Sequence, residues 1–421
     1  MKKIIIWSVV GIIIVGIAAA AFWWLRRPQV ITLNDGTKLT LLAVTYGRHQ
    51  VLPRNVKTAS ARNQRAPVFN TPNNTLVVWI RQEHPANHWP NYQLYLYDKA
   101  GTACVGNSGQ WNNYGGGTNE IVAIQFNAFP RRQGKFIVRV QEYIQNEGQV
   151  LNEKHFVISN PAHNGSFPDW TAESLPVTKT DGDFSVTLAK LNFGVDANFN
   201  RDQDNPDDAI NKGVEAVFQV QQNGTNAVNW QPAQIETSDA TGNHQSAGCS
   251  SHWDGDNLVA DYQWGLWPGE PWKLRVEFSK QSGFTSDELL TVTNIPFRPG
   301  NRNDFWNWSR SRTNTPFAEA TVNGVLVKIY PAQQFADEMQ PSAVLLVRAD
   351  SLPEGMQLTL LKLTDSQGND IDHWGWSTDA YGMRDIEGVT NLTVTIAVHQ
   401  DHFFEFTAKP GKVSASDDTG Q

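Results

Sequence analysis

The segment Ile31–Gly47 reads ITLNDGTKLTLLAVTYG, and its pattern returns twice later in the chain. The second version is VTKTDGDFSVTLAKLNFG at Val177–Gly194, and the third is ATVNGVLVKIYPA at Ala320–Ala332. Each version places an Asp-Gly or Asn-Gly pair before a run in which apolar and polar residues alternate. Asn and Gly tolerate the positive φ angles of tight hairpin turns, and alternation is typical of a half-buried strand. Each segment therefore predicts a β-hairpin.

The three copies continue to correspond beyond these hairpins. Each contains an apolar run that predicts a central strand: Leu76–Ile80, Val214–Val220 and Ala343–Val347. Each then has a D-x-x-G sequence, which is typical of a type I turn: Asp98–Gly101, Asp239–Gly242 and Asp365–Gly368. Each ends in two further strands: EIVAIQF and KFIVRVQEY, NLVADYQW and WKLRVEFS, NLTVTIAV and FFEFTAKP. The chain therefore repeats one β unit three times.

Units of about 110–135 residues with several short strands and regular turns are typical of β-sandwiches. We therefore predict a mainly β chain with three tandem immunoglobulin-like β-sandwiches at residues 29–165, 166–300 and 301–413. The Cys…Trp…Cys pattern of true immunoglobulin domains is absent, so the prediction concerns the architecture alone. Residues 1–28 form a separate N-terminal segment, and residues 414–421 are expected to be a flexible tail.

Ile4–Leu25 is a stretch of 22 residues without a charged side chain. As a helix it would extend about 33 Å, enough to cross a hydrocarbon core of about 30 Å. Lys2 and Lys3 flank one end of the stretch, and Arg26 and Arg27 flank the other. We therefore predict an uncleaved, single-pass transmembrane helix, with the lipid bilayer as a partner of this chain.

A cleaved signal peptide is the alternative interpretation of the same stretch. Lys2 and Lys3 fit its charged start, and Ala18–Ala21 supply small residues for a cleavage site. The apolar run continues to Leu25, however, and exceeds the usual signal-peptide core of about 7–15 residues.

We expect the large C-terminal part to lie outside the cytoplasm, in the periplasm or the extracellular space.

The C-terminal part is acidic. The whole sequence carries a formal charge of −8, with 34 Lys and Arg against 42 Asp and Glu. Four of the basic residues flank the apolar stretch, which leaves 30 basic against 42 acidic residues elsewhere. A nucleic-acid-binding surface needs a basic face, so this balance argues against nucleic acid as a partner.

The segment VDANFNRDQDNPDD, at residues 195–208, is the sharpest candidate for a metal site. Its oxygen-bearing side chains are spaced as in a calcium-binding loop: Asp196, Asn198, Asn200, Asp202 and Asp207. The loop departs from the EF-hand pattern, because Arg201 stands where Gly is expected and the last ligand is Asp instead of Glu. The two interpretations are a Ca²⁺ site and a solvated acidic loop without a cofactor.

Tryptophans in polar or Gly/Pro-rich contexts are the candidate ligand-facing residues. They are Trp267 and Trp272 in WPGEPW, and Trp374 and Trp376 in HWGW. An exposed indole can stack on a sugar ring or contact a protein partner. The alternative is that each ring covers the end of its own sandwich, and a Trp after the D-x-x-G turn of every copy favours that packing role.

The two cysteines, Cys104 and Cys249, fall in different copies, so no disulfide can form within one predicted sandwich. A bond between them would need Cα atoms within about 7 Å, and two buried thiols are the simpler expectation.

The sequence contains no nucleophile elbow, P-loop, zinc-protease motif or Rossmann glycine pattern. We therefore expect no enzyme activity.

The motif LNDGTKLTLLAVTYG, at Leu33–Gly47, together with the repeats, resembles uncharacterised bacterial proteins anchored by one N-terminal span. The resemblance implies a location and a repeated β fold, and it implies no activity or site residue. The expected function is a membrane-anchored structural, adhesive or binding module for a glycan or protein ligand. An array of carbohydrate-binding modules that uses the loop tryptophans is the second hypothesis, and a hydrolase is the third.

Overall fold

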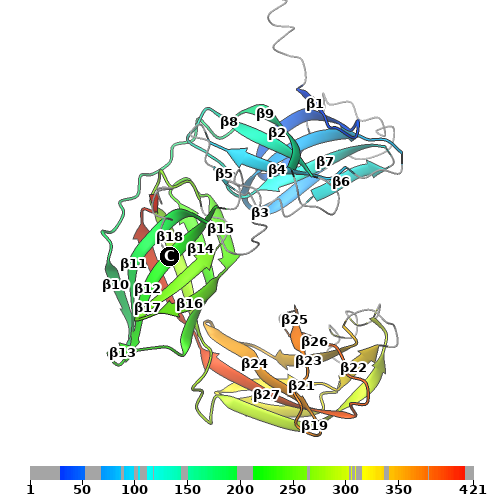
Figure 1. Ribbon diagram of the computed structural model, residues 1–421, viewed down its shortest axis with the longest axis vertical. Helices are drawn as coiled ribbons and strands as arrows, with labels where there is room; N and C mark the ends of the chain where they lie inside the picture. Colours follow the sequence, from blue (N-terminus) through cyan, green and yellow to red (C-terminus); the bar gives the residue numbers. More distant parts are fainter. Residues whose placement is uncertain are drawn as a thin grey trace, which may run out of the picture.

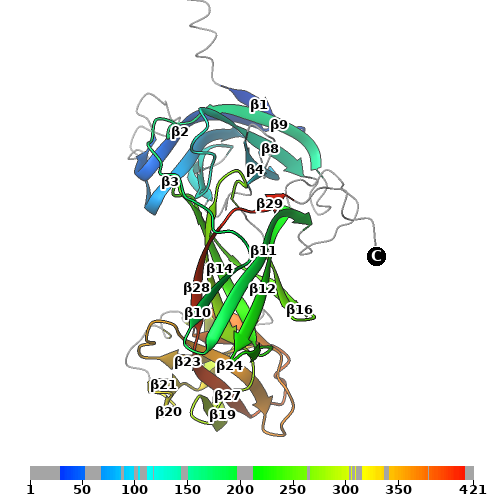
Figure 2. The ribbon, with the colours of Figure 1, turned by 90° about the vertical axis from the view of Figure 1, so that its left-hand side faces the viewer.

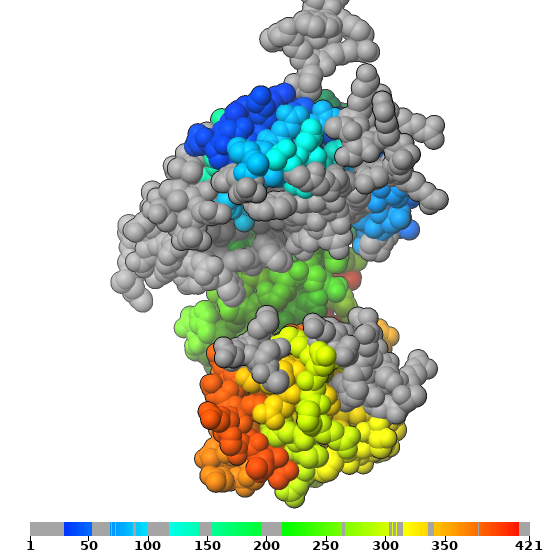
Figure 3. All heavy atoms as spheres, turned by 90° about the vertical axis from the view of Figure 1, so that its right-hand side faces the viewer, coloured from blue at the N-terminus to red at the C-terminus, as the bar shows by residue number. Residues whose placement is uncertain are grey.

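The computed structural model describes residues 29–52, 68–86, 90–98, 103–104, 111–116, 118–143, 150–196, 212–262, 266–302, 305, 309, 315–335, 341–377 and 379–412. Most of these residues lie in β-strands and almost none in helices, which confirms the prediction of a mainly β chain. The strands form three bodies arranged in an arc (Figure 1). Body 2, in green, lies between body 1, in blue and cyan, and body 3, in yellow and orange (Figure 3).

Body 1 consists of two sheets that enclose an apolar core. The first sheet has the order β1 (Val30–Thr32), β2 (Lys38–Val51), β3 (Val68–Glu83), β7 (Asn119–Phe126), β6 (Trp111–Gly116). The second has the order β5 (Ala103–Cys104), β4 (Tyr92–Tyr97), β8 (Lys135–Tyr143), β9 (Val150–Ser159). Alternate residues of β3, such as Leu76, Val78 and Ile80, are fully buried in the core. Two sheets around one core are consistent with a sandwich.

Body 2 repeats this plan. One sheet has the order β10 (Val177–Asp181), β11 (Phe184–Asp196), β12 (Lys212–Gln222), β17 (Asn257–Tyr262), β16 (Ser250–Asp254), with β13 (Thr225–Asn226) on β12 and β29 (Gly411–Lys412) on β11. The other has the order β15 (His244–Gly248), β14 (Trp230–Asp239), β18 (Trp272–Lys280), β28 (His402–Ala408). Apolar residues of bodies 1 and 2 form one continuous buried cluster.

Body 3 has a connected set of strands in the order β20 (Ala318–Val322), β21 (Val325–Ile329), β23 (Ala343–Ala349), β22 (Ala332–Phe335), β19 (Leu289–Gly300), β27 (Asn391–Gln400), β24 (Met356–Asp365). The hairpin of β25 (His373–Ser377) and β26 (Ala380–Met383) joins it through β23. Its main core is separate from that of bodies 1 and 2.

The three predicted hairpins are confirmed as β1–β2, β10–β11 and β20–β21. Their glycines have positive φ angles: +87° at Gly36, +60° at Gly182 and +78° at Gly324. A Cβ atom added to any of the three would meet nothing within 4 Å. The turn therefore selects glycine for its backbone conformation and not for space.

Relative to the order of strands in body 1, bodies 2 and 3 exchange strands: β19 joins body 3, and the later strand β28 joins body 2. In body 1, β8 pairs with the next strand along the chain, β9. The corresponding strand of body 2, β18, instead pairs with β28, with Trp272 opposite Ala408. The strand that follows β18, β19, pairs with β27 of body 3, with Leu289 opposite Ala397. Figure 2 shows the dark red β28 among the green strands of body 2.

This exchange corrects the predicted boundaries of the second and third units. Residues 289–300 belong to body 3, not to the unit 166–300, and residues 402–412 belong to body 2, not to the unit 301–413. Packing gives the physical reason. Phe404 and Phe406 of β28 are buried in the body 2 core, where Phe406 lies 6.3 Å from Phe218 and Phe404 lies 6.0 Å from Phe278 between ring centres.

The predicted membrane span, Ile4–Leu25, and the predicted tail, 414–421, lie outside the described residues. Among the residues that the structure does describe, none forms a helix that is both long and apolar enough to cross a bilayer. The transmembrane helix therefore stays a prediction from the sequence.

Phe406→Ala is expected to destabilise body 2 by about 3–5 kcal/mol, because it removes a buried aromatic side chain. In hydrogen-exchange mass spectrometry, β18 should lose protection while β27 keeps it. Glu405→Ala is the matched control, since Glu405 points outward and makes a surface ion pair with Lys273. Loss of protection in β27 with β18 unchanged would contradict the placement of β28 in body 2.

Candidate functional site

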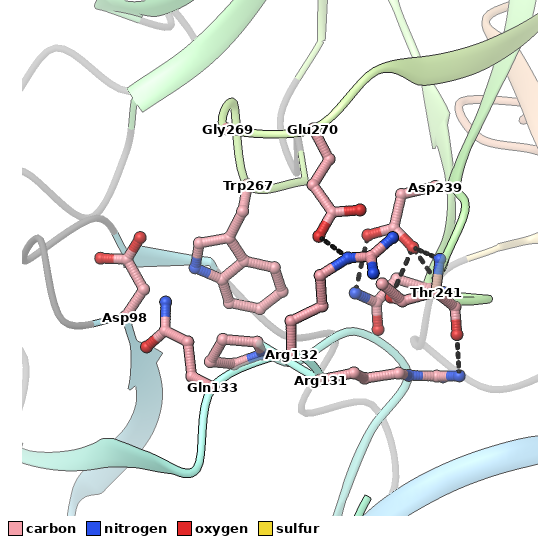
Figure 4. Close-up of a pocket in the computed structure, with 11 residues that line it drawn as sticks. Asp98, Arg131, Arg132, Gln133, Asp239, Thr241, Trp267, Gly269 and Glu270 are labelled. Carbon is pink, nitrogen blue, oxygen red and sulfur yellow. Dashed lines mark hydrogen bonds and ion pairs between the residues drawn. The ribbon is translucent and has the colours of Figure 1, made fainter. Parts of the chain in front are cut away.

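A pocket of about 130 Å³ lies where the end of body 1 meets the end of body 2 (Figure 4). Corresponding elements of the two bodies line it. Asp98 directly follows β4, and Asp239 is the last residue of β14. The β7–β8 connection contributes residues 130–133, and the β17–β18 connection contributes Trp267, Gly269 and Glu270. The site therefore exists only because the two repeats meet end to end.

Asn243 joins the two bodies at the base of this site. Its Oδ1 accepts a hydrogen bond from the backbone N–H of Phe129 at 3.1 Å, and its Nδ2 donates to the carbonyl of the same residue at 3.0 Å. Both residues are buried. Because an unpaired buried amide is costly, this two-point contact fixes how body 1 sits on body 2.

The turn that carries Asn243 is the predicted D-x-x-G turn, and it recurs in body 3. In body 2, Asp239 accepts hydrogen bonds from the backbone N–H of Asn243 at 3.1 Å and from its Nδ2 at 2.8 Å. In body 3, Asp365 accepts the same two bonds from Asn369 at 2.9 and 2.8 Å. The body 2 turn is buried and the body 3 turn is exposed. The two turns therefore have the same local structure, but only the one in body 2 takes part in docking.

Arg131 crosses the junction beside this turn. Its Nη1 donates to the carbonyl of Thr241 at 2.8 Å and to the hydroxyl of Tyr46 at 3.1 Å. The guanidinium also lies over the rings of Tyr46 and Phe129, at 5.3 and 4.9 Å from their centres. Burial lowers the pKa of Arg131, while the nearby Tyr46 and Asp239 act in the opposite direction. This residue supplies a fixed positive charge inside the junction.

A second arginine closes the outer side of the pocket. Arg132 donates from Nε to Glu270 at 2.8 Å, and its Nη2 lies 3.0 Å from Asp169. Burial raises the pKa of Glu270, and the hydrogen bond from Arg132 opposes that shift. The pair holds the Glu270 carboxylate against body 1, so the charge at this wall is compensated.

Of the four predicted ligand-facing tryptophans, only Trp267 lines this pocket, and this residue is 7% exposed. The prediction is wrong for Trp272, which has no exposed surface and whose Nε1 donates to the carbonyl of Trp267 at 3.0 Å. Trp374 and Trp376 are half-buried in body 3. Trp374 packs on Arg384 and Trp376 on Phe305, so packing accounts for both.

The predicted calcium loop cannot be placed. Asp196 is the last residue of β11, while Asn198, Asn200, Asp202 and Asp207 lie outside the described residues. Within the part of the chain that the structure describes, no three His, Cys, Asp or Glu side chains are grouped to hold a metal. Calcium binding therefore stays a prediction.

Cys249 is a half-buried free thiol. Its Sγ donates to the carbonyl of Pro232 at 3.0 Å, and burial raises its pKa to about 12. Such a thiol is an inert packing group at neutral pH. The side chain of Cys104 lies outside the described part of the structure.

A second polar cluster lies where the chain crosses between bodies 2 and 3. His399 and Asp401 are 0% and 2% exposed, and their Nδ1 and Oδ1 atoms lie 3.0 Å apart without the alignment of a hydrogen bond. His399 Nε2 lies 3.2 Å from Thr359 Oγ1. Burial raises the pKa of Glu277, and the adjacent Asp401 raises it further, while Gln357 and Arg275 oppose the shift.

A search of protein-family models and of curated proteins finds no match to this chain. The geometry of the two junctions is therefore the basis for assigning a function.

Asn243→Ala is expected to lower the free energy of unfolding by about 2–4 kcal/mol, because it leaves the buried N–H and carbonyl of Phe129 without partners. Asn369→Ala makes the same change in the exposed body 3 turn and should cost about 1 kcal/mol. Urea unfolding measures both values. Equal losses would show that the junction contact contributes nothing beyond the turn itself.

Glu277→Gln is expected to flatten the pH dependence of stability. The folded protein holds the Glu277 proton to a higher pH than the unfolded chain, so its stabilising contribution is complete below about pH 4.3 and is lost as the pH rises. The amide that replaces the carboxyl keeps a donor toward Asp401 at every pH, and the variant should melt about 1–3 °C above the parent at pH 7 but not at pH 4. Melting curves of this variant and of the exposed control Glu405→Gln test this. Parallel curves for the parent and Glu277→Gln would refute it.

Proposed function

We propose that the protein is a membrane-tethered recognition module, held by Ile4–Leu25 and presenting three immunoglobulin-like β bodies outside the cytoplasm. Its role is to bind a ligand or partner, and it carries out no bond-breaking chemistry. The observation that carries the proposal is the fixed coupling of bodies 1 and 2, in which a continuous apolar core and the Asn243–Phe129 contact place a polar pocket between two rigid frames.

The coupling of bodies 2 and 3 supports the same role. The chain crosses between them twice, because body 3 follows β18 and precedes β28. Lys280 and Glu288 form a largely buried ion pair of 2.9 Å at one crossing, and His399 and Asp401 are buried at the other. A frame fixed at both joints suits a protein that holds binding surfaces at a distance from a membrane.

Two of the three carboxylates that line the pocket already serve structural contacts, which favours recognition over catalysis. Asp239 is saturated by hydrogen bonds from Thr241 and Asn243, and Glu270 is paired with Arg132. A general acid or a nucleophile needs a carboxylate that is available to the substrate. These two groups serve the structure of the junction instead.

A carbohydrate-binding protein is the second candidate function. It is favoured by Trp267, an indole in a pocket with charged and amide side chains. Such a site would use one ring at a junction, and not an array of loop tryptophans, because Trp272 is buried and Trp374 and Trp376 pack within body 3.

Membrane fractionation of cells that express the full chain tests the tether. The protein should stay in the membrane pellet after an alkaline wash, and external protease should digest it in cells with an opened envelope. A variant that lacks residues 4–25 should stay inside the cell as a soluble protein. Release of the full chain with a new N-terminus after Ala18–Ala21 would instead show a cleaved signal peptide and overturn the tether.

A further inference from the structure

One buried donor in the junction pocket has no partner in the protein. Trp267 is more than nine-tenths buried, at 7% exposure, and its Nε1 has no hydrogen-bond acceptor among the described residues. Leaving such a donor unpaired costs about 1–3 kcal/mol. Trp272, five residues later, shows the contrast, because its Nε1 has an acceptor in the Trp267 carbonyl. An acceptor on a bound molecule would satisfy this donor.

The indole nitrogen faces the pocket. Figure 4 shows Trp267 with this nitrogen on the side toward Asp98 and Gln133, which come from body 1. A group bound there would contact body 2 through the indole and body 1 through a carboxylate and an amide. Such a group would bridge the two bodies and stabilise their junction.

The charges of the pocket select the ligand class. Its charged side chains are Asp98, Arg131, Arg132, Asp239 and Glu270, a formal sum of −1. An anionic ligand would meet this excess of carboxylates, and an ammonium group would offer no acceptor to the indole N–H. A neutral hydroxyl can accept from Trp267 and donate to Asp98 or Gln133 at the same time. A neutral ring that carries neighbouring hydroxyl groups therefore matches this lining best.

The size of the pocket limits the ligand to one ring. About 130 Å³ is well below the 300–1,000 Å³ typical of drug-sized ligands, so the pocket can take part of one small ring while the rest extends through its opening. Gly269 lies at the exposed side, where an added Cβ would meet nothing within 4 Å. A large side chain at position 269 could therefore enter the pocket opening without forcing the backbone.

We propose that this pocket binds a neutral monosaccharide unit, free or at the end of a glycan, through the Trp267 N–H. The inference rests on the proposed recognition function and gives it a ligand class and a site. The ring of the sugar lies against the indole, and its hydroxyls bridge Trp267 to Asp98 and Gln133.

Isothermal titration of the full-length protein, in a detergent without a sugar headgroup, tests the proposal. The probes are glucose, galactose, mannose and N-acetylglucosamine, with glucuronate and glucosamine as charged analogues. At least one neutral sugar should bind with a Kd of about 0.1–10 mM and bind at least fivefold more tightly than its charged analogue. Thermal melting should rise with that sugar, because it binds across the junction.

Two variants locate the site. Trp267→Phe keeps an aromatic ring but removes the N–H, and it should weaken binding at least fivefold. Gly269→Phe should block binding by filling the opening. Trp253→Phe is the matched control: Trp253 also has a buried Nε1 without a hydrogen bond, but it lies in β16 away from the pocket, and its change should leave the Kd unaltered.

The contrary outcomes are distinct. Absence of binding by every sugar at 50 mM (about five times the weakest expected Kd) would overturn the proposal, and a pocket filled by water alone would give this result. Binding that both pocket variants leave unchanged would overturn it as well. In either case a membrane-retained, protease-accessible protein would leave the proposed function standing, whereas a released protein would overturn the tether alone.

Discussion

Pairing along the edge of β18 holds the second half of the molecule together. An unpaired edge next to a buried aromatic core exposes a row of backbone groups that need partners. β28 supplies those partners for β18 and brings Phe404 and Phe406 into the body 2 core. Since body 3 lies between β18 and β28 in the sequence, this one pairing makes body 3 an insertion within body 2 and draws the chain back across the joint.

The junction of bodies 1 and 2 depends on a local turn that gains a second use. A five-residue turn that keeps its hydrogen bonds without burial, as its exposed copy at Asp365–Asn369 shows, becomes a docking element where Asn243 meets Phe129. The pocket follows from the same meeting, because loops that would end an isolated sandwich face each other. The unpaired indole N–H and the excess of one carboxylate in the pocket lining are properties of the two bodies together.

Local features of this fold could be predicted from the sequence, and long-range ones could not. The Asp-Gly and Asn-Gly hairpins and the D-x-x-G turns are fixed by residues a few positions apart, so their patterns are readable. Alternation predicts that residues 402–408 form a strand, but it does not say whether β18 or β27 is the partner. Asn243 likewise has the sequence context of an ordinary turn residue, because its contact with Phe129 joins positions more than one hundred residues apart.

The candidate site shows the same division. The polar context of the WPGEPW segment predicts that both Trp267 and Trp272 face a ligand. Trp267 does line the pocket, but Trp272, in the same segment, has no exposed surface. Periodicity cannot distinguish the two, because both lie in one short segment and only the approach of body 1 gives Trp267 a pocket to face.

The exchanged strands also set an order of events on the ribosome. When β18 emerges, β14 is already present, but its second native partner, β28, follows roughly 120 residues later, which at about 5–20 residues per second is on the order of 6–24 s. Its nearest neighbour in the chain, β19, arrives at once and has the position that β9 holds beside β8 in body 1. Nascent chains thus have time to close the second body with the wrong strand, and the correct arrangement must prevail over this earlier competitor.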